Sequence, residues 1–195
     1  MKYELYIDDQ IEIDEIWDIC EKIIKSSKLK KETWEVRRRV IKSIIGSEYY
    51  DYYGVCDPMM DLFQALMFTQ KEKIESADIA FKIGSDYMKR DGAKLYKECG
   101  QQEKYISFVE QHLKDKEENY MEVINYYKST NHDKAVEIAE LGMKKCKDDQ
   151  TDIIFFLIQC AREDDDTDKE SRLLKSAKAR RTVDFSRVNH ALEKM

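Results

Sequence analysis

An acidic run in the C-terminal third is the first place where residue types could do chemistry. The segment Glu163–Asp168, EDDDTD, has carboxylates at alternate positions from Asp164, as a calcium-binding loop does at its start. An EF-hand loop that opens there needs Gly at its sixth position and Glu at its twelfth, where this chain has Lys169 and Lys175. We therefore predict a solvated turn between two helices.

The histidines and cysteines are the next candidates, and their spacing favours neither a metal nor a disulfide. No histidine has a second His or Cys three or four residues away, and the cysteines are odd in number with no C-x-x-C pair. We interpret the thiols as small buried apolar residues, while a Cys–His nucleophile pair assembled by the fold stays open. The residues concerned are His112, His132, His190, Cys20, Cys56, Cys99, Cys146 and Cys160.

Two basic clusters stand out in an acidic chain. Arg37-Arg38-Arg39 has Lys30, Lys31 and Lys42 nearby, and the second cluster is Lys175, Lys178, Arg180 and Arg181. They could hold phosphates or an acidic peptide, or they could form solvated helix faces that pair with the abundant Glu and Asp. Binding of nucleic acid through these clusters is the alternative to a protein partner.

The densest aromatic run, Glu48–Gly54, completes the candidate residues. Tyr49 and Tyr53 would share one face of a helix while Tyr50 and Tyr52 point elsewhere, so at least one tyrosine is expected at the surface. Core packing explains most of them, and a partner contact explains the remainder. The candidate partner-binding residues are Trp34, Arg37, Arg38, Tyr49, Tyr50 and Tyr53.

Composition favours an all-α protein. The 195 residues are 42% hydrophobic and include a single Pro and only six Gly, too few for the turns of hairpins and sandwiches. The net charge of -6 argues against a general nucleic-acid binder and an anionic membrane surface. No apolar stretch is long enough to span a membrane, and MKYELYIDDQ lacks the apolar core of a signal peptide, so we expect a cytoplasmic protein.

The N-terminal helices are predicted from apolar spacing and capping residues. We expect helices over 10–26, 33–53 and 58–68, the last with Asp57 as its cap and Pro58 at its first position. Thr69 and Glu72 form a capping box for a fourth helix.

Beyond residue 85 the predicted boundaries are regular. Gly100 ends one helix, Asn131 caps another, and the last helix covers 184–192. A further capping box is predicted at Asp115 with Glu118, and later helices are expected to open at Asp149 with Asp152 and at Thr167 with Glu170.

The stretch 115–149 reads as two amphipathic helices joined by a polar turn. An acidic residue followed by Lys stands near three predicted helix starts, at 103, 133 and 168, which are separated by 30 and 35 residues. Such a period, with two helices per unit, is typical of a helix-turn-helix solenoid.

The segment 133–143, DKAVEIAELGM, resembles the second helix of a tetratricopeptide repeat. Small residues recur at Ala135, Ala139 and Gly142, where neighbouring helices would approach closely, and Tyr126 stands where that repeat commonly has Tyr. The chain departs from the pattern at Glu122 and Val123, and no Pro closes the unit.

Residues 49–189 also resemble the helical C-terminal region of bacterial proteins that carry a SWIM zinc finger upstream. The resemblance rests on CDPM at 56–59, GAKLY at 92–96, KAVEIA at 134–139 and VDF at 183–185. It implies a helical fold. The zinc finger itself is absent from this chain, so no metal-binding or DNA-binding residue is carried over.

Together these features predict one domain over 1–195, with irregular helices over 1–68 and tetratricopeptide-like repeats over 69–195 that form an α-α superhelix. We expect a non-catalytic scaffold without cofactor or metal that binds a protein or peptide. The alternative is a nucleic-acid-associated accessory protein, and an enzyme ranks third. The oligomeric state and the partner are left open.

Overall fold

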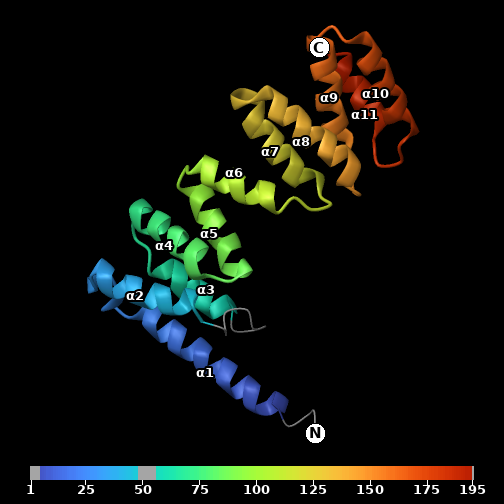
Figure 1. Cartoon of the computed structure of the whole chain (residues 1–195). Helices are drawn as coiled ribbons and strands as arrows, with labels where there is room; N and C mark the ends of the chain where they lie inside the picture. Colours follow the sequence, from blue (N-terminus) through green and yellow to red (C-terminus); the bar gives the residue numbers. More distant parts are fainter. Residues whose placement is uncertain (1–4, 48–55, 195) are drawn as a thin grey trace. The chain divides into compact units, whose positions relative to one another are not determined.

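The computed structural model describes residues 5–47 and 56–194, with side chains described over 14–47 and 57–194. Over these residues the regular elements are α-helices and one short 3-10 helix, which confirms the all-α class (Figure 1). None of the described helices is both long and apolar enough to cross a membrane.

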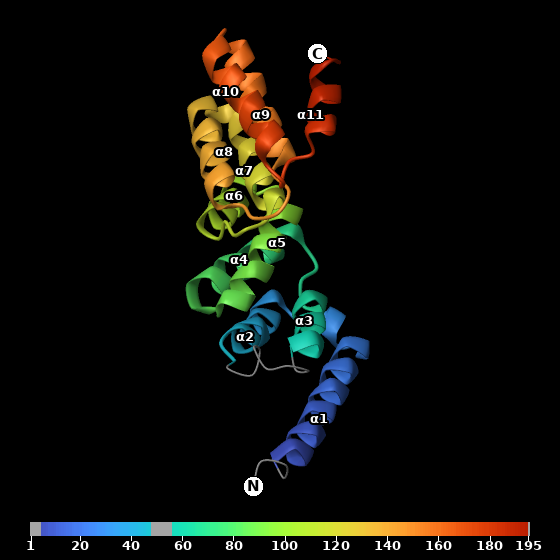
Figure 2. The same ribbon diagram turned by 90° about the vertical axis from the view of Figure 1, so that its right-hand side faces the viewer.

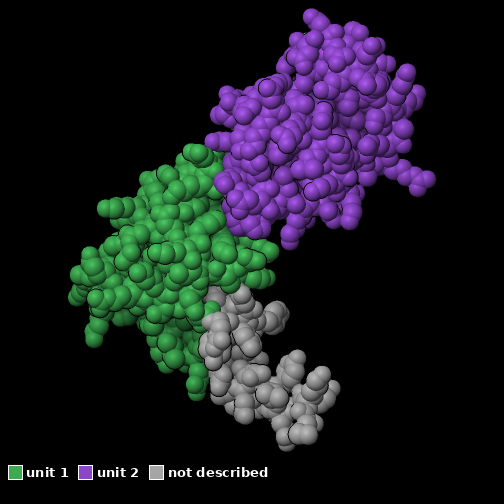
Figure 3. All heavy atoms as spheres, in the orientation of Figure 1, with its two compact units in different colours: residues 1–105 green, residues 106–195 purple. Residues whose placement is uncertain are grey.

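The helices form two compact units, 1–105 and 106–195, divided within α6 (Figure 3). Before the division lie α1 (Leu5–Lys25), η1 (Leu29–Lys31), α2 (Trp34–Ile45), α3 (Cys56–Ala65), α4 (Gln70–Ile83) and α5 (Asp86–Glu98). Helix α6 covers Gln102–Gln111. The second unit contains α7 (Glu117–Thr130), α8 (His132–Lys145), α9 (Thr151–Glu163), α10 (Thr167–Ala179) and α11 (Phe185–Leu192).

In the first unit, α1 packs on α3, α2 packs on α4, and α4 pairs closely with α5 (Figure 2). The apolar stripes predicted from the sequence supply the core, in which Ile41, Phe63, Leu66, Ala80 and Met88 are almost fully buried. Cys20 joins the same core from α1. This packing holds α4 against α2, so that side chains of the two helices can contact each other.

Several predicted boundaries in this unit are wrong. Helix α2 ends at Ile45 with Gly46 as its C-cap, so it does not run on through Tyr53. Helix α3 begins at Cys56, which makes Pro58 its third residue and not its first. Proline is tolerated there because the first four N–H groups of a helix lack intrahelical partners.

Helix α3 also ends earlier than predicted, at Ala65 and not at Phe68. The cause is a competing acceptor, since the backbone N–H of Phe68 donates to the Glu72 carboxylate at 2.7 Å. The start of α4 thus captures the residues that would have extended α3.

Several predicted end signals are confirmed. Thr69 and Glu72 form a complete capping box, and Asn131 caps α8 by accepting from Lys134 N–H. Gly100 has a φ of 71° after α5, and the next N–H, of Gln101, donates to Tyr96 O at 2.8 Å. This is the Schellman arrangement that favours glycine.

The capping box predicted at Asp115 and Glu118 is wrong, and the helix expected to open at Asp149 and Asp152 has a different capping group. Helix α7 begins at Glu117 without a side-chain cap. Helix α9 begins at Thr151, and the side chain of its N-cap residue, Gln150, does not cap it. The Glu117 carboxylate instead accepts from the N–H groups of Asp152, at 2.7 Å, and Ile153, so it caps α9 from another helix. Burial raises the pKa of Glu117, and these N–H groups oppose that rise.

The acidic run is the turn between α9 and α10, as predicted. Asp165 has a φ of 55°, and the Asp166 N–H donates to Ala161 O at 2.9 Å, so α9 ends in a second Schellman arrangement. Asp166 then caps α10 by accepting from Lys169 N–H, one residue before the predicted cap at Thr167. Two of the run's residues therefore serve helix ends.

The second unit contains two closely packed helix pairs, α7 with α8 and α9 with α10, and α8 also packs on α9. The small residues Ala135, Ala139 and Gly142 are buried, as predicted. An acidic residue and Lys occupy the second and third positions of α6, α8 and α10, but α6 belongs to neither of these pairs. The 30-residue spacing therefore links elements that are not equivalent.

Gly142 gives a test of this packing. A Cβ at position 142 would lie 2.9 Å from Ile153 Cδ1 and 3.0 Å from Tyr120 Cδ1, and both side chains are fully buried. Ala is a better helix former than Gly. We nevertheless expect Gly142→Ala to lower the free energy of unfolding by about 1–2 kcal/mol, because the surrounding core side chains have no room to move away from the added methyl group. Urea unfolding followed by circular dichroism measures this. Lys144→Ala, exposed on the same helix, is the control, and equal effects would contradict the close contact.

Candidate functional site

The structure separates the predicted partner-binding residues. Trp34 and Arg38 lie at the start of α2 and are partly exposed, whereas Arg37 is only 5% exposed. Tyr49, Tyr50 and Tyr53 lie outside the described residues. The described candidates therefore all lie on α2, which packs on α3 and α4.

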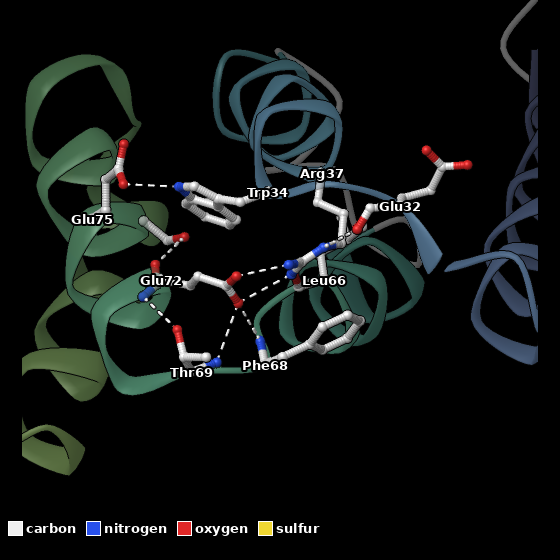
Figure 4. A network of polar contacts seen from close by, with 9 residues as sticks. Glu32, Trp34, Arg37, Leu66, Phe68, Thr69, Glu72 and Glu75 are labelled. Atoms are coloured by element: carbon white, nitrogen blue, oxygen red, sulfur yellow. Dashed lines mark hydrogen bonds and ion pairs between the residues drawn. The ribbon is translucent and has the colours of Figure 1, made fainter. Parts of the chain in front are cut away.

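Arg37 is held by a dense set of acceptors (Figure 4). Its Nη1 donates to Leu66 O at 2.5 Å and to Glu72 Oε2 at 3.0 Å, and its Nη2 donates to Glu72 Oε1 at 2.7 Å. Its Nε donates to Glu32 O at 3.3 Å. The guanidinium also lies over the Phe68 ring, 3.9 Å from the centroid. Arg37 thus joins α2 to the end of α3 and the start of α4.

Glu72 has two roles at once. Its carboxylate binds Arg37 and also accepts the N–H groups of Phe68 and Thr69, the second as part of the capping box of α4. The Arg37 hydrogen bonds hold the pKa of Glu72 below its usual range, against the effect of burial. A buried charge pair is stable only when its remaining hydrogen-bonding groups are satisfied, as they are here.

The expectation that Arg37 contacts a partner is therefore revised, because its guanidinium is buried and hydrogen-bonded within the first unit. Arg180, from the second basic cluster, is also used internally, since its Nη1 donates to Gln150 Oε1 at 3.0 Å and to Met143 O. Sequence could not distinguish these arginines from solvated ones because most of their acceptors, such as Glu72 for Arg37 and Gln150 for Arg180, lie about 30 or more residues away.

An open groove lies on α4 and is lined by Gln70, Lys71, Ile74, Glu75 and Asp78. Lys71, Ile74, Glu75 and Asp78 stand at positions i, i+3, i+4 and i+7, so they share one helix face. Glu75 accepts from Trp34 Nε1 at 2.9 Å and pairs with Arg38. The two partly exposed candidates from α2 therefore meet the groove through one of its carboxylates. Figure 4 shows the contact of Trp34 with Glu75.

Asp78 is the second carboxylate of the groove, and its donors come from the next two helices. Tyr96 of α5 donates its hydroxyl proton to Asp78 at 2.6 Å, and Lys104 of α6 pairs with the same carboxylate at 2.7 Å. Although burial acts to raise the pKa of Asp78, the bonds from Lys104 and Tyr96 outweigh it and lower that pKa. Both carboxylates of the groove are thus occupied by the protein's own donors.

Sequence reasoning missed all five groove residues. The signal was present as a polar stripe around Ile74, with Lys71, Glu75 and Asp78 at matching helical positions. A solvated helix face has the same pattern, so only the neighbouring helices distinguish a groove from an ordinary surface.

The described thiols are poorly suited to nucleophilic chemistry. Cys20, Cys99, Cys146 and Cys160 are buried, and desolvation raises the pKa of each, which disfavours the reactive thiolate. Among the residues whose placement is described, no three His, Cys, Asp or Glu side chains lie together so that they could hold a metal ion.

Comparisons with protein-family models, with curated proteins and with solved structures found no match to this chain. The tetratricopeptide-like and SWIM-related resemblances therefore stay predictions.

The Arg37–Glu72 pair can be tested by removing the cation. We expect Arg37→Met to lower the free energy of unfolding by about 3–5 kcal/mol, because it leaves the Glu72 carboxylate buried without its counter-charge. Both tryptophans, Trp17 and Trp34, lie in the first unit, so fluorescence-detected urea unfolding reports on this unit. Arg39→Met, at an exposed position of the same helix, should change it by less than about 0.5 kcal/mol. Similar losses in both variants would contradict a structural role for Arg37.

The same pair predicts a pH dependence. Because the folded-state pKa of Glu72 is lowered, its contribution to stability is complete above the unfolded pKa and is lost as pH falls through the folded value. The difference in unfolding free energy between wild type and Glu72→Gln should therefore be largest near neutral pH and shrink below about pH 4.5. Urea titrations at several pH values measure that difference. A difference that is constant down to about pH 3 would count against the assignment.

Proposed function

We propose that this protein is a non-catalytic helical scaffold that binds an extended peptide segment of a partner protein in the groove on α4. The observation that carries the proposal is the groove itself, in which Ile74 offers apolar surface between the polar groups of Lys71, Glu75 and Asp78. Open grooves of mixed polarity on paired helices suit peptides better than they suit small substrates, which prefer enclosed pockets.

The aromatic side chains nearby support the same proposal. Trp34 is half-buried and donates to Glu75, and Phe68 is 47% exposed just before the first groove residue, Gln70. Trp and Arg are enriched at binding hot spots, and Arg38 approaches the groove from the same helix as Trp34. Trp34, Arg38 and Phe68 are therefore the side chains that we expect a partner to contact.

The solenoid type is part of the proposal. It is supported by the closely packed pairs α4–α5, α7–α8 and α9–α10, and by the buried small residues of α8. Stacked helix pairs generate extended surfaces suited to protein partners. A cytoplasmic location is likewise retained as a prediction.

The nucleic-acid alternative has less support. Of the three consecutive arginines, Arg37 is buried and Arg38 is paired with Glu75, which leaves Arg39 as the exposed member without an ion pair among the described residues. An enzymatic role is also weakened by the burial of the described thiols.

Selection from a random-peptide display library tests the proposal. We expect enriched peptides to protect the backbone of residues 70–78 from hydrogen exchange, because those residues line the groove. Lys71→Glu should weaken the selected peptides by roughly two- to fivefold, as expected for a change at an exposed charge. Lys175→Glu, the same change at an exposed position of α10, should leave binding unchanged. Enrichment of no peptide, or protection only outside α4, would overturn the proposal.

A further inference from the structure

The charges around the α4 groove are not balanced. The Glu75 carboxylate accepts a hydrogen bond from Trp34 and forms an ion pair with Arg38. The Asp78 carboxylate accepts a hydrogen bond from Tyr96 and forms an ion pair with Lys104. Each carboxylate thus already has two donors from neighbouring helices. A ligand that offered a cation would have to displace those donors.

Lys71 is the cation of the groove lining that has no carboxylate partner among the described residues. It is exposed on the same face of α4, and within the described part of the chain it forms no ion pair or hydrogen bond. With Arg38 and Lys104, the groove and its border carry three cations against the two carboxylates, although the whole chain has a net charge of -6. Among the described residues, the groove therefore offers a ligand one unpaired cation, whereas both of its carboxylates are already paired.

Ile74 lies one helical turn beyond Lys71, a rise of about 4.5 Å along the helix. In an extended peptide, side chains on the same side recur at every second residue, about 6.6 Å apart, and the flexible lysine stem covers the difference. An acidic side chain at Lys71 would thus place the side chain two residues away over Ile74.

We infer that the groove selects an extended peptide with an acidic side chain, held at Lys71, and an aliphatic side chain two residues away that packs on Ile74. This inference rests on the proposed peptide-binding function and adds the chemical class of the ligand. Arg38 and Lys104 then donate to the peptide's carbonyl oxygens, because the carboxylates they bind leave part of each cation exposed.

Three synthetic pools of twelve-residue peptides test the inference, each with a fixed central motif and otherwise random positions. The motifs are Glu-Xaa-Leu, Gln-Xaa-Leu and Lys-Xaa-Leu, written in either chain direction. Peptides retained by the immobilised full chain are counted by mass spectrometry. We expect the glutamate pool to be retained roughly two- to fivefold over the glutamine pool, and the lysine pool to be retained least.

The deciding variant is Lys71→Glu, which should reverse the order and favour the lysine pool. A misfolded protein cannot produce such a reversal, and Lys175→Glu should keep the wild-type order. Equal retention of all three pools, or a preference that Lys71→Glu does not change, overturns the inference while the peptide-binding proposal stands. Retention of no pool, together with failure of the display selection, overturns both.

Discussion

The buried pair of Arg37 and Glu72 is the interaction on which the first unit most depends. Removing two charges from water costs several kcal/mol for each ion, and this cost is offset only when the pair is well aligned and the remaining polar atoms find partners. Here the guanidinium reaches the carbonyl oxygens of Glu32 and Leu66, and the carboxylate also accepts the N–H groups of Phe68 and Thr69. One ion pair thus holds α2, ends α3 and begins α4.

The candidate site follows from the same pair. Glu75 lies one helical turn after Glu72, and Trp34 lies almost one turn before Arg37, so the contact that joins α2 to α4 also brings Trp34 to Glu75. Beyond it, the pairs of Arg38 with Glu75 and of Lys104 with Asp78 are partly exposed. Solvent weakens those outer pairs, so they add little to stability and remain available for recognition.

The second unit relies on the hydrogen bonds of Gln150 and on small residues. The Gln150 amide donates to the carbonyl oxygens at the end of α8, and its own oxygen accepts from Arg180 and Thr182. Gly142 lets Tyr120 and Ile153 pack without a gap.

The sequence by itself determined what depends on neighbours in the chain: the all-α class, the capping box of Thr69 and Glu72, the cap at Asn131, the glycine after α5 and the buried small residues of α8. Periodicity and capping involve residues at most a few positions apart, so they can be read directly. Only the tertiary structure decided that Arg37 is buried, that Glu117 caps a distant helix and that α4 carries a groove. Glu72 lies 35 residues from Arg37, and Asp152 lies 35 residues from Glu117. Partners so far apart in the chain meet only when the helices pack, so local sequence patterns do not reveal them.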